Sequence, residues 1–365
     1  MIPDRPDTPV PLASICIVSE LPPPPGGIAV QARLLTDNLR KQGHAVYNAP
    51  TNPLSHSSSL RRLKWIRGVV NLNLFLVRLW GACRKADCVH ILSHSYLSFF
   101  LFTSPAVAVG KLLGKKVIIH YHGGAAESFL QKWFWLARFT FASADIVVVP
   151  SGFLSSVFRK FGVETLEVPN VLELEAFPFR KRSPLRPHVI MARHLEPDYN
   201  VACGIRAFAI LRESYPDATL TIAGNGSEKS LLISLCRDLG IVESVTFVGN
   251  VANERMRALY DEADIYLNSS RVDNQPVSIL EAFACGLPVV TTAVGGIPYM
   301  VTPGEDSLLA PDGDSAGLAA HMRTLLDDPA IGERLVGSAR TRVQEHSWKT
   351  IYSKQSLIYL PEKES

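Results

Sequence analysis

The chain has 365 residues, of which 47% are hydrophobic and 19% are charged, and its formal net charge is +3. This length allows two domains, each with its own core, and the composition excludes a disordered chain. So small a net charge argues against nucleic acid as a main partner. The six cysteines are scattered without a Cys-x-x-Cys pair, which favours reduced thiols in a cytosol over a disulfide framework. No basic region followed by an apolar core opens the chain, so we expect no signal peptide.

The first half of the chain alternates short apolar runs with amphipathic segments. Residues 15–18 are expected to form a buried first strand, and Gly26 and Gly27 open a helix that Gly43 closes. Strand, glycine turn, helix and strand make the doubly wound unit, which places the glycine pair at the carboxyl end of a strand. A phosphate or sugar could approach bare backbone there, although a plain tight turn explains the pair equally well. Further strands are expected at residues 88–92, 115–124 and 144–151.

Two segments of this half could contact or cross a membrane. The helix between Arg61 and Arg84 combines basic and aromatic residues, which suits an anionic membrane surface. A solvated basic face over an ordinary core face is an equal alternative. Residues 96–114 are nearly all apolar and approach membrane-spanning length. Because they contain Pro105 and lie between two strand-like runs, a buried helix of an α/β domain is the favoured interpretation.

Residues 171–187 carry charges and three prolines without a clear period, so we expect them to be a linker. A Rossmann-like domain is expected at residues 1–170 and a second at residues 188–345. A final helix at residues 346–365 is expected to pack back on the first domain. The fold class is therefore α/β, with two doubly wound domains facing a central cleft, and clefts at strand ends hold ligands.

Residues 273–296 have the pattern of a loop, a short helix, a tight turn, a strand and a loop. Asp273 or Asn274 could cap the helix, Pro276 suits its first turn, and Gly286 ends it. The helix start, with its free backbone N–H groups and positive dipole end, is a natural anion site.

Glu281 is the exception in this helix, because it lies among small and apolar residues. A carboxylate there needs a partner, since an unpaired buried charge is costly. An acid, a helix start and the Gly295-Gly296 loop together suggest a nucleotide diphosphate, with phosphates on the helix start and ribose hydroxyls on Glu281. The two glycines could also form only a turn.

Six features follow one another along the chain. They are Gly26-Gly27, His-Tyr-His-Gly-Gly at 120–124, Arg193, Ala-Gly-Asn-Gly at 223–226, Phe-Val-Gly-Asn at 247–250, and residues 273–296. On these features the chain resembles the family 4 retaining glycosyltransferases of the GT-B fold (glycosyl transferases group 1). The resemblance covers nearly all of the chain and is strongest in its second half. It implies a nucleotide-sugar donor held mainly by the second domain, retention of anomeric configuration, and neither a metal nor a cofactor.

The resemblance also assigns roles to single residues. Glu281 matches the second acid of the family's E-x7-E motif, which holds the donor ribose, and Asp273 falls where the first acid reaches the sugar hydroxyls. Arg193 matches the phosphate-binding arginine and His122 the histidine near the transferred sugar, so these two and Asp273 are the expected catalytic residues. The N-terminal glycine pair matches the glycines that meet the diphosphate or the acceptor. The other expected donor-binding residues lie in two glycine turns and at the helix start: Gly224, Asn225, Gly226, Val248, Gly249, Gln275, Pro276, Val277 and Ser278.

Two positions depart from the family pattern. A lysine is expected about six residues after Arg193, and Tyr199 and Asn200 stand there instead, where His194 could compensate. The first acid is Asp273 rather than a glutamate, one methylene shorter.

Three candidate residues have plainer alternatives. Arg193 could form a surface ion pair instead of binding phosphate. His122 could be a structural histidine at a strand end rather than a catalytic one. His120 is expected on the other side of the strand, in a structural role.

The sequence thus predicts a hexosyltransferase that uses a UDP- or GDP-sugar and a glycan or lipid-linked acceptor in cell-surface polysaccharide synthesis. We expect it in the cytoplasm, with a peripheral contact at the inner face of the plasma membrane and no nucleic-acid partner. One alternative is a non-catalytic nucleotide-sugar-binding subunit, and another is a GT-B sugar-nucleotide 2-epimerase.

Overall fold

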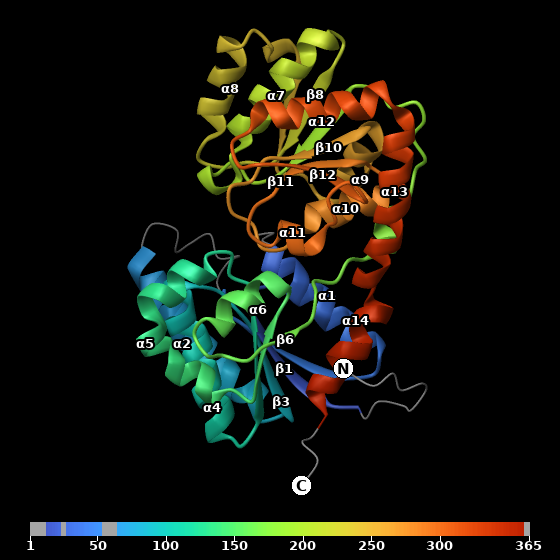
Figure 1. Ribbon diagram of the computed structural model, residues 1–365. Helices are drawn as coiled ribbons and strands as arrows, with labels where there is room; N and C mark the ends of the chain where they lie inside the picture. The colour runs from blue at the N-terminus through green and yellow to red at the C-terminus, as the bar shows by residue number, and fades with distance from the viewer. Residues whose placement is uncertain (1–11, 23–26, 53–63, 361–365) are drawn as a thin grey trace. The chain divides into compact units, whose positions relative to one another are not determined.

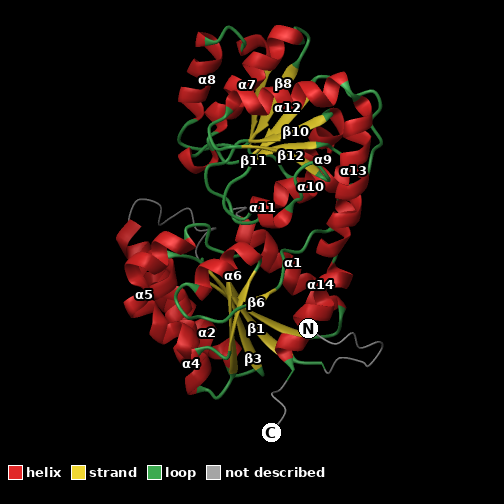
Figure 2. Cartoon of the chain, viewed as in Figure 1, coloured by secondary structure: helices red, strands yellow, loops and turns green. Residues whose placement is uncertain are grey.

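The computed structural model describes residues 12–22, 27–52 and 64–360 (Figure 1). Two of the predicted residues, Gly26 and Arg61, lie outside these ranges. The chain divides into two compact units: unit 1 comprises Met1–Val171 and Trp348–Ser365, and unit 2 comprises Leu172–Ser347. Strands and helices alternate in both units (Figure 2). The predicted α/β class with two doubly wound domains is confirmed.

Unit 1 contains a six-stranded sheet. Its strands are β1 (Ser14–Ser19), β2 (Ala45–Pro50), β3 (Cys88–Ser93), β4 (Lys116–Tyr121), β5 (Ile146–Val149) and β6 (Leu166–Glu167). They are all parallel, in the order β2-β1-β3-β4-β5-β6. Ile15 of β1 pairs with Val46 of β2 on one side and with Cys88 of β3 on the other. The central strands are nearly continuous apolar runs, as expected of parallel strands buried on both faces.

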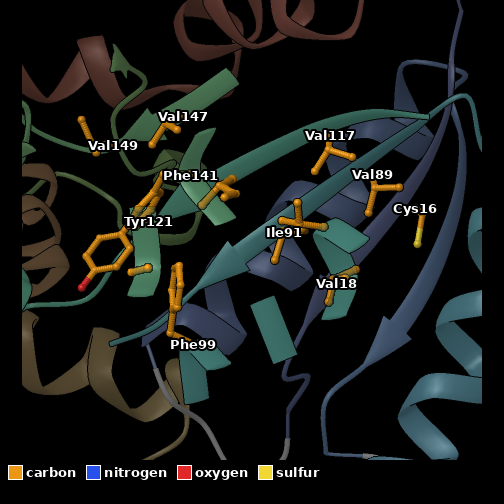
Figure 3. Packing of buried hydrophobic residues seen from close by; sticks show 14 of the residues in the cluster. Cys16, Val18, Val89, Ile91, Phe99, Val117, Tyr121, Phe141, Val147 and Val149 are labelled. Atoms are coloured by element: carbon orange, nitrogen blue, oxygen red, sulfur yellow. The ribbon is translucent and has the colours of Figure 1, made fainter. Parts of the chain in front are cut away.

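Helices cover both faces of this sheet. They are α1 (Gly27–Lys41), α2 (Lys64–Cys83), α3 (Tyr96–Ser98), the π-helical turn η2 (Phe99–Thr103), α4 (Ser104–Leu112), α5 (Ala126–Ser143), α6 (Gly152–Arg159), α14 (Trp348–Gln355) and η7 (Ser356–Tyr359). One core, which includes Phe75, Val107 and Phe141, packs α2, α4, α5 and α6 on the sheet (Figure 3). A second core, which includes Leu39 and Ile351, packs α1 and α14 against it.

The apolar segment at residues 96–114 forms α3, η2 and α4 in direct succession. Pro105 lies in the first turn of α4, directly after the π-helical turn. The segment is helical and belongs to an α/β unit, as predicted, but it is only partly buried, since Leu97 is 69% exposed and Leu112 is 78% exposed. It also contains a π-helical turn that the sequence did not indicate. Within the three described ranges of the chain, no helix is both long and apolar enough to cross a membrane.

Unit 2 contains a second six-stranded sheet. Its strands are β7 (His188–Ala192), β8 (Thr219–Ala223), β9 (Val245–Gly249), β10 (Ile265–Asn268), β11 (Val289–Thr292) and β12 (Ser307–Ala310). They are parallel, in the order β12-β11-β10-β7-β8-β9. The chain runs from β7 through β8 to β9 and then returns to the other side of β7 as β10. The carboxyl ends of β7 and β10 therefore flank a topological switch point.

The helices of unit 2 pack on both faces of its sheet in two cores. They are η3 (Leu174–Ala176), η4 (Pro197–Tyr199), α7 (Val201–Ser214), α8 (Lys229–Asp238), η5 (Val242–Ser244), α9 (Asn253–Glu262), α10 (Val277–Cys285), α11 (Ile297–Met300), α12 (Ser315–Asp327), α13 (Pro329–Val343) and η6 (Gln344–His346).

Three arginines from the segment expected to be a linker converge on Asp264. Oδ2 of Asp264 lies 2.8 Å from Nε of Arg186, and Oδ1 lies 2.7 Å from Nη2 of Arg180 and 3.6 Å from Nε of Arg182. Burial alone would raise the pKa of Asp264, but the hydrogen bonds from Arg186 and Arg180 outweigh it and hold the pKa below its ordinary value. The segment is thereby fixed to unit 2.

Candidate functional site

The residues predicted in the second half of the chain gather at the switch point of the unit 2 sheet. Arg193 follows β7, Asp273 follows β10, and the glycine turn that starts at Gly224 follows β8. Backbone hydrogen bonds join these loops, since Arg193 N donates to Ala223 O over 3.0 Å and Gly224 N to Gly249 O over 2.9 Å. Doubly wound sheets bind ligands at such points.

Arg193 is nearly enclosed, with 11% of its side chain exposed, and it forms an ion pair with Asp273, which is 12% exposed. Its Nη1 lies 3.2 Å from Oγ of Ser278 and its Nη2 lies 3.4 Å from Oγ of Ser270. Nε of Arg193 is buried and has no hydrogen-bond partner within the described ranges. The ion pair that the alternative expected is present, but it is largely enclosed rather than on the surface. A buried donor without an acceptor is uncommon, and an oxygen of a bound anion would satisfy it.

Tyr199 supports Arg193 at the position where the resemblance implies a lysine. The guanidinium carbon of Arg193 lies 4.5 Å from the centroid of the Tyr199 ring, which is a cation–π contact. Tyr199 ends the short turn η4, whose Asp198 carbonyl accepts a hydrogen bond from Arg271 N over 2.8 Å. The same turn therefore holds both the guanidinium and the loop that follows β10.

Glycines allow the backbones of these loops to approach closely. Gly224 has a φ of +150°, and a Cβ at this position would collide with the carbonyl oxygen of Arg193. A Cβ on Gly296 would collide with the carbonyl oxygen of Asn274, and Gly296 N donates to Asp273 O over 2.9 Å. This second glycine pair is therefore more than a turn, because it fixes the loop before α10.

The prediction that Asp273 or Asn274 caps α10 is wrong. The helix begins at Val277, Pro276 stands in the cap position with φ −66° and ψ 107°, and no side chain caps the helix. The proline holds the backbone extended at this point, and the Asp273 carboxylate is engaged instead by Arg193 and by Asn274 N, which donates to Oδ1 over 2.9 Å. The first N–H groups of α10 thus lie beside the guanidinium without a side-chain cap, an arrangement that favours an anion.

Ser278 connects the helix start to the sheet. Its Oγ accepts a hydrogen bond from the hydroxyl of the buried Tyr266 over 2.7 Å and also contacts Arg193. The remaining predicted donor residues lie in the same loops: Asn225 and Gly226 after β8, Val248 and Gly249 at the end of β9, and Gln275 before α10.

Glu281 of α10 has the partner that its surroundings required. The hydroxyl of Tyr260, on α9, donates to Oε2 of Glu281 over 2.7 Å. Burial raises the pKa of Glu281, while this hydrogen bond and the charge of Arg193 act in the opposite direction. An ionised carboxylate can accept about four hydrogen bonds, so the bond from Tyr260 leaves acceptor capacity for a ribose hydroxyl.

His122 and Gly27 belong to unit 1, where His122 follows β4 and Gly27 opens α1. The ring centroids of His122 and His120 are 4.1 Å apart, so the prediction that His120 points to the other side of the strand is wrong. The reason is that residues two apart share a face of a strand. Burial and the neighbouring His120 lower the pKa of His122 well below its ordinary value. The neutral imidazole can exchange a hydrogen bond with a sugar hydroxyl but supplies no positive charge.

A chain of buried polar side chains lies behind His122. Nδ1 of His120 is 3.2 Å from Nε2 of His90, and Nδ1 of His90 is 2.8 Å from the hydroxyl of Tyr359 in η7. Nε2 of Gln355, in α14, donates to the same hydroxyl over 2.7 Å. The segment that ends the described chain thus supports the candidate histidine.

Unit 2 is thus a doubly wound α/β unit with an enclosed guanidinium and an uncapped helix start at its switch point, where such folds bind ligands. Residues 175–342 match the family model described as glycosyl transferases group 1, and residues 25–175 match glycosyltransferase family 4. The glycogen synthase of Mycobacterium tuberculosis is 30% identical over 297 residues, which cover 76% of this chain and 70% of that protein. The chain belongs to the family 4 glycosyltransferases.

Three other proteins are also similar to this chain. Sulfoquinovosyl transferase of Arabidopsis thaliana is 24% identical over 296 residues, which cover 74% of this chain and 56% of that protein. The solved structure of Anabaena HepE in complex with UDP-glucose superposes with a TM-score of 0.73 at 18% identity, over 95% of this chain and all (100%) of that one. Sucrose-phosphate synthase from Thermosynechococcus elongatus gives a TM-score of 0.72 at 21% identity, over 95% and 98% of the two chains. These likenesses show the GT-B fold.

Proposed function

We propose that this chain is a retaining, metal-independent hexosyltransferase that moves a hexose from a UDP- or GDP-sugar to a glycan or lipid-linked acceptor in cell-surface polysaccharide synthesis. The observation that carries the proposal is the enclosed Arg193 guanidinium at the switch point, whose buried Nε has no acceptor among the described residues. Support also comes from HepE, which shares the fold and holds UDP-glucose in its solved complex. The acceptor would bind unit 1, at the cytoplasmic side of a membrane.

The chemistry of transfer gives each residue its part. When the bond between sugar and diphosphate breaks, negative charge develops on the leaving group, and fixed donors aimed at it lower the barrier. Arg193 and the first N–H groups of α10 would be those donors. The diphosphate would compete with Asp273 for the guanidinium, which frees the Asp273 carboxylate for the sugar hydroxyls. Glu281 would hold the ribose, and the neutral His122 would hydrogen-bond the sugar.

The donor site is tested by thermal stabilisation. Native protein is heated with UDP-, GDP- and ADP-sugars, and a ligand at about 100 times its Kd stabilises the native state by about 2.7 kcal/mol. We expect the Tm to rise with one nucleotide class in the wild type and not in Glu281→Ala, because that variant lacks the ribose acceptor. Glu213→Ala changes an exposed glutamate of α7 in the same unit and should keep the full shift. Folded wild type that gains no stability from any of these donors would contradict the proposal.

The two alternatives give different results in a turnover assay. Stabilisation by a donor without transfer or donor hydrolysis, across a panel of acceptors, would indicate the non-catalytic nucleotide-sugar-binding subunit. The observation that favours it is Tyr199 in place of a phosphate-binding lysine. Release of a changed nucleotide sugar without an acceptor would identify a 2-epimerase.

Tyr199→Ala is expected to weaken nucleoside diphosphate binding by about tenfold, because a desolvated cation–π contact contributes about 1–2 kcal/mol to the position of the guanidinium. Tyr199→Phe keeps the ring over Arg193 and should bind like the wild type. Titration calorimetry with the nucleoside diphosphate and with the nucleoside alone distinguishes binding of the diphosphate group from binding of the nucleoside. Only the affinity for the nucleoside diphosphate should fall. Equal losses of affinity for both ligands would contradict this prediction, because they would show that Tyr199 affects the whole pocket and not only the position of Arg193.

A further inference from the structure

Unit 1 exposes an unusual concentration of large apolar side chains. Ten of the nineteen that are exposed in the described part of the chain lie between residues 69 and 139. Val77 is 72% exposed, Trp135 is 63% exposed and Phe139 is 60% exposed. We call the following six residues the α2–α5 apolar face: Val69, Val77 and Trp80 of α2, and Trp135, Leu136 and Phe139 of α5. Many large exposed apolar side chains in one part of a protein mark an interaction site.

The core of unit 1 does not account for this face. Phe75 and Leu79 already bury the opposite side of α2, and Leu130 and Ala137 bury the opposite side of α5. Both helices are thus apolar on two sides, whereas a surface helix needs only one apolar stripe to pack on its sheet.

The two helices belong to one layer. They pack with α4 on the same face of the sheet, in one core, as Figure 1 shows. Aromatic contacts through η2 join them, because Phe102 lies 5.2 Å from Phe75 of α2 and Phe100 lies 5.9 Å from Trp133 of α5, measured between ring centroids. The α2–α5 apolar face is therefore held on a fixed scaffold.

The charge of the two helices indicates which kind of partner binds the α2–α5 apolar face. The sequences of α2 and α5 contain five lysines and arginines against one carboxylate, Glu127. Glu127 pairs with Lys160 over 2.7 Å. A second copy of the chain would bring like charge against like charge, while an anionic surface would neutralise it.

The arrangement on α5 fits a lipid interface. Lys132 shares the outward stripe with Trp135 and Phe139 at helical spacing, and the guanidinium of Arg138 lies 4.8 Å from the centroid of the Phe139 ring. Aromatic rings settle at the level of lipid headgroups, and neighbouring lysines and arginines reach the phosphates.

We propose that the α2–α5 apolar face docks unit 1 on an anionic membrane, with Trp135, Leu136 and Phe139 entering the interface and Lys132 and Arg138 on lipid phosphates. This inference rests on the proposed function and identifies the surface that would contact the membrane. The sequence analysis had placed that contact only on the helix between Arg61 and Arg84. Docking here combines apolar insertion with charge and depends on no residue of the nucleotide site.

The test is flotation of the full chain with vesicles. Phosphatidylcholine vesicles are compared with vesicles in which about a third of the lipid is phosphatidylglycerol, in low salt and at about 0.5 M salt. We expect the wild type to bind the anionic vesicles and to lose most of that binding in high salt. The Trp135→Ser, Phe139→Ser double variant and the Lys132→Glu, Arg138→Glu double variant should each bind at least about tenfold more weakly. Leu231→Ser changes a residue of α8 that is 70% exposed, and it should bind like the wild type.

The Tm and the donor-induced Tm shift are the controls for folding and for the donor site. All substituted residues are exposed, so the Tm and the donor-induced shift should stay at wild-type values, which separates this proposal from the donor site. Equal vesicle binding by the wild type and both double variants would overturn the proposal. Absence of wild-type binding, together with self-association that Trp135→Ser, Phe139→Ser abolishes, would overturn it in favour of a second copy.

Discussion

Arg193→Ala is expected to lower kcat/KM for sugar transfer by a factor of about 10²–10³, the loss typical of removing one fixed donor to a developing anion. Ser278, Ser270 and the ring of Tyr199 hold the guanidinium, so it stays in position when the diphosphate displaces Asp273 from it. Most of the loss should appear in kcat, because the charge grows as the sugar departs. Initial rates with the donor identified by thermal stabilisation would measure it.

Two variants control this experiment. Arg206→Ala removes an exposed arginine of α7 in the same unit and should retain wild-type rates. Because Arg193→Ala leaves the enclosed Asp273 without its cation, the double variant Arg193→Ala, Asp273→Asn should regain thermal stability without regaining activity. Wild-type kcat/KM in Arg193→Ala would exclude this arginine as the diphosphate ligand.

Asp264→Ala is expected to lower the free energy of unfolding of unit 2 by about 3–5 kcal/mol, because it leaves buried arginine charge uncompensated. Asp264 is 1% exposed and forms ion pairs with Arg180, Arg182 and Arg186, which lie in the segment expected to be a linker. Urea unfolding would measure the change. The matched control is Asp261→Ala, since Asp261 pairs with the same Arg180 over 3.0 Å but is 67% exposed, and it should cost less than about 1 kcal/mol.

The same carboxylate gives the stability of unit 2 a defined acid dependence. The pKa of Asp264 is lowered in the folded chain, so its contribution is present above the pKa of about 3.9 in the unfolded chain. That contribution is lost as the pH falls through the lower folded value. Urea midpoints measured across this range should fall less steeply for Asp264→Asn than for the wild type. Parallel curves would show that other carboxylates dominate the acid transition.

Local sequence patterns were sufficient to predict the sheets and the candidate loops. The apolar run at residues 15–18 predicted a buried strand, which the structure shows as β1. The close backbone approach at Gly224 and Gly296 was not predicted and is seen only in the structure. The resemblance placed Arg193 and Asp273 in one site, and they lie in contact.

The predictions that were wrong, and the site residues that the sequence analysis missed, depend on contacts between elements that are distant in the sequence. Tyr260, on α9, reaches Glu281 from 21 residues away, and nothing in its own neighbourhood in the sequence marks it. The cap of α10 was assigned wrongly because Asp273 has a better partner in Arg193, which a local rule cannot include. The position of Tyr199, six residues after Arg193, marked it in the sequence as a departure from the family pattern. Only the structure shows that its ring lies against the guanidinium of Arg193.

The return of α14 to unit 1 imposes an order on biosynthesis. Residues 172–347 emerge from the ribosome as one continuous stretch and can complete their unit at once. Unit 1 must wait for residues 348–359, on the order of ten seconds or more at about 5–20 residues per second. Until then the side of its sheet that receives Ile351, Ile358 and Tyr359 stays uncovered and His90 lacks its tyrosine. Unit 1 is therefore synthesised first but completes its folding last. A stop codon before α14 would destabilise unit 1 rather than unit 2.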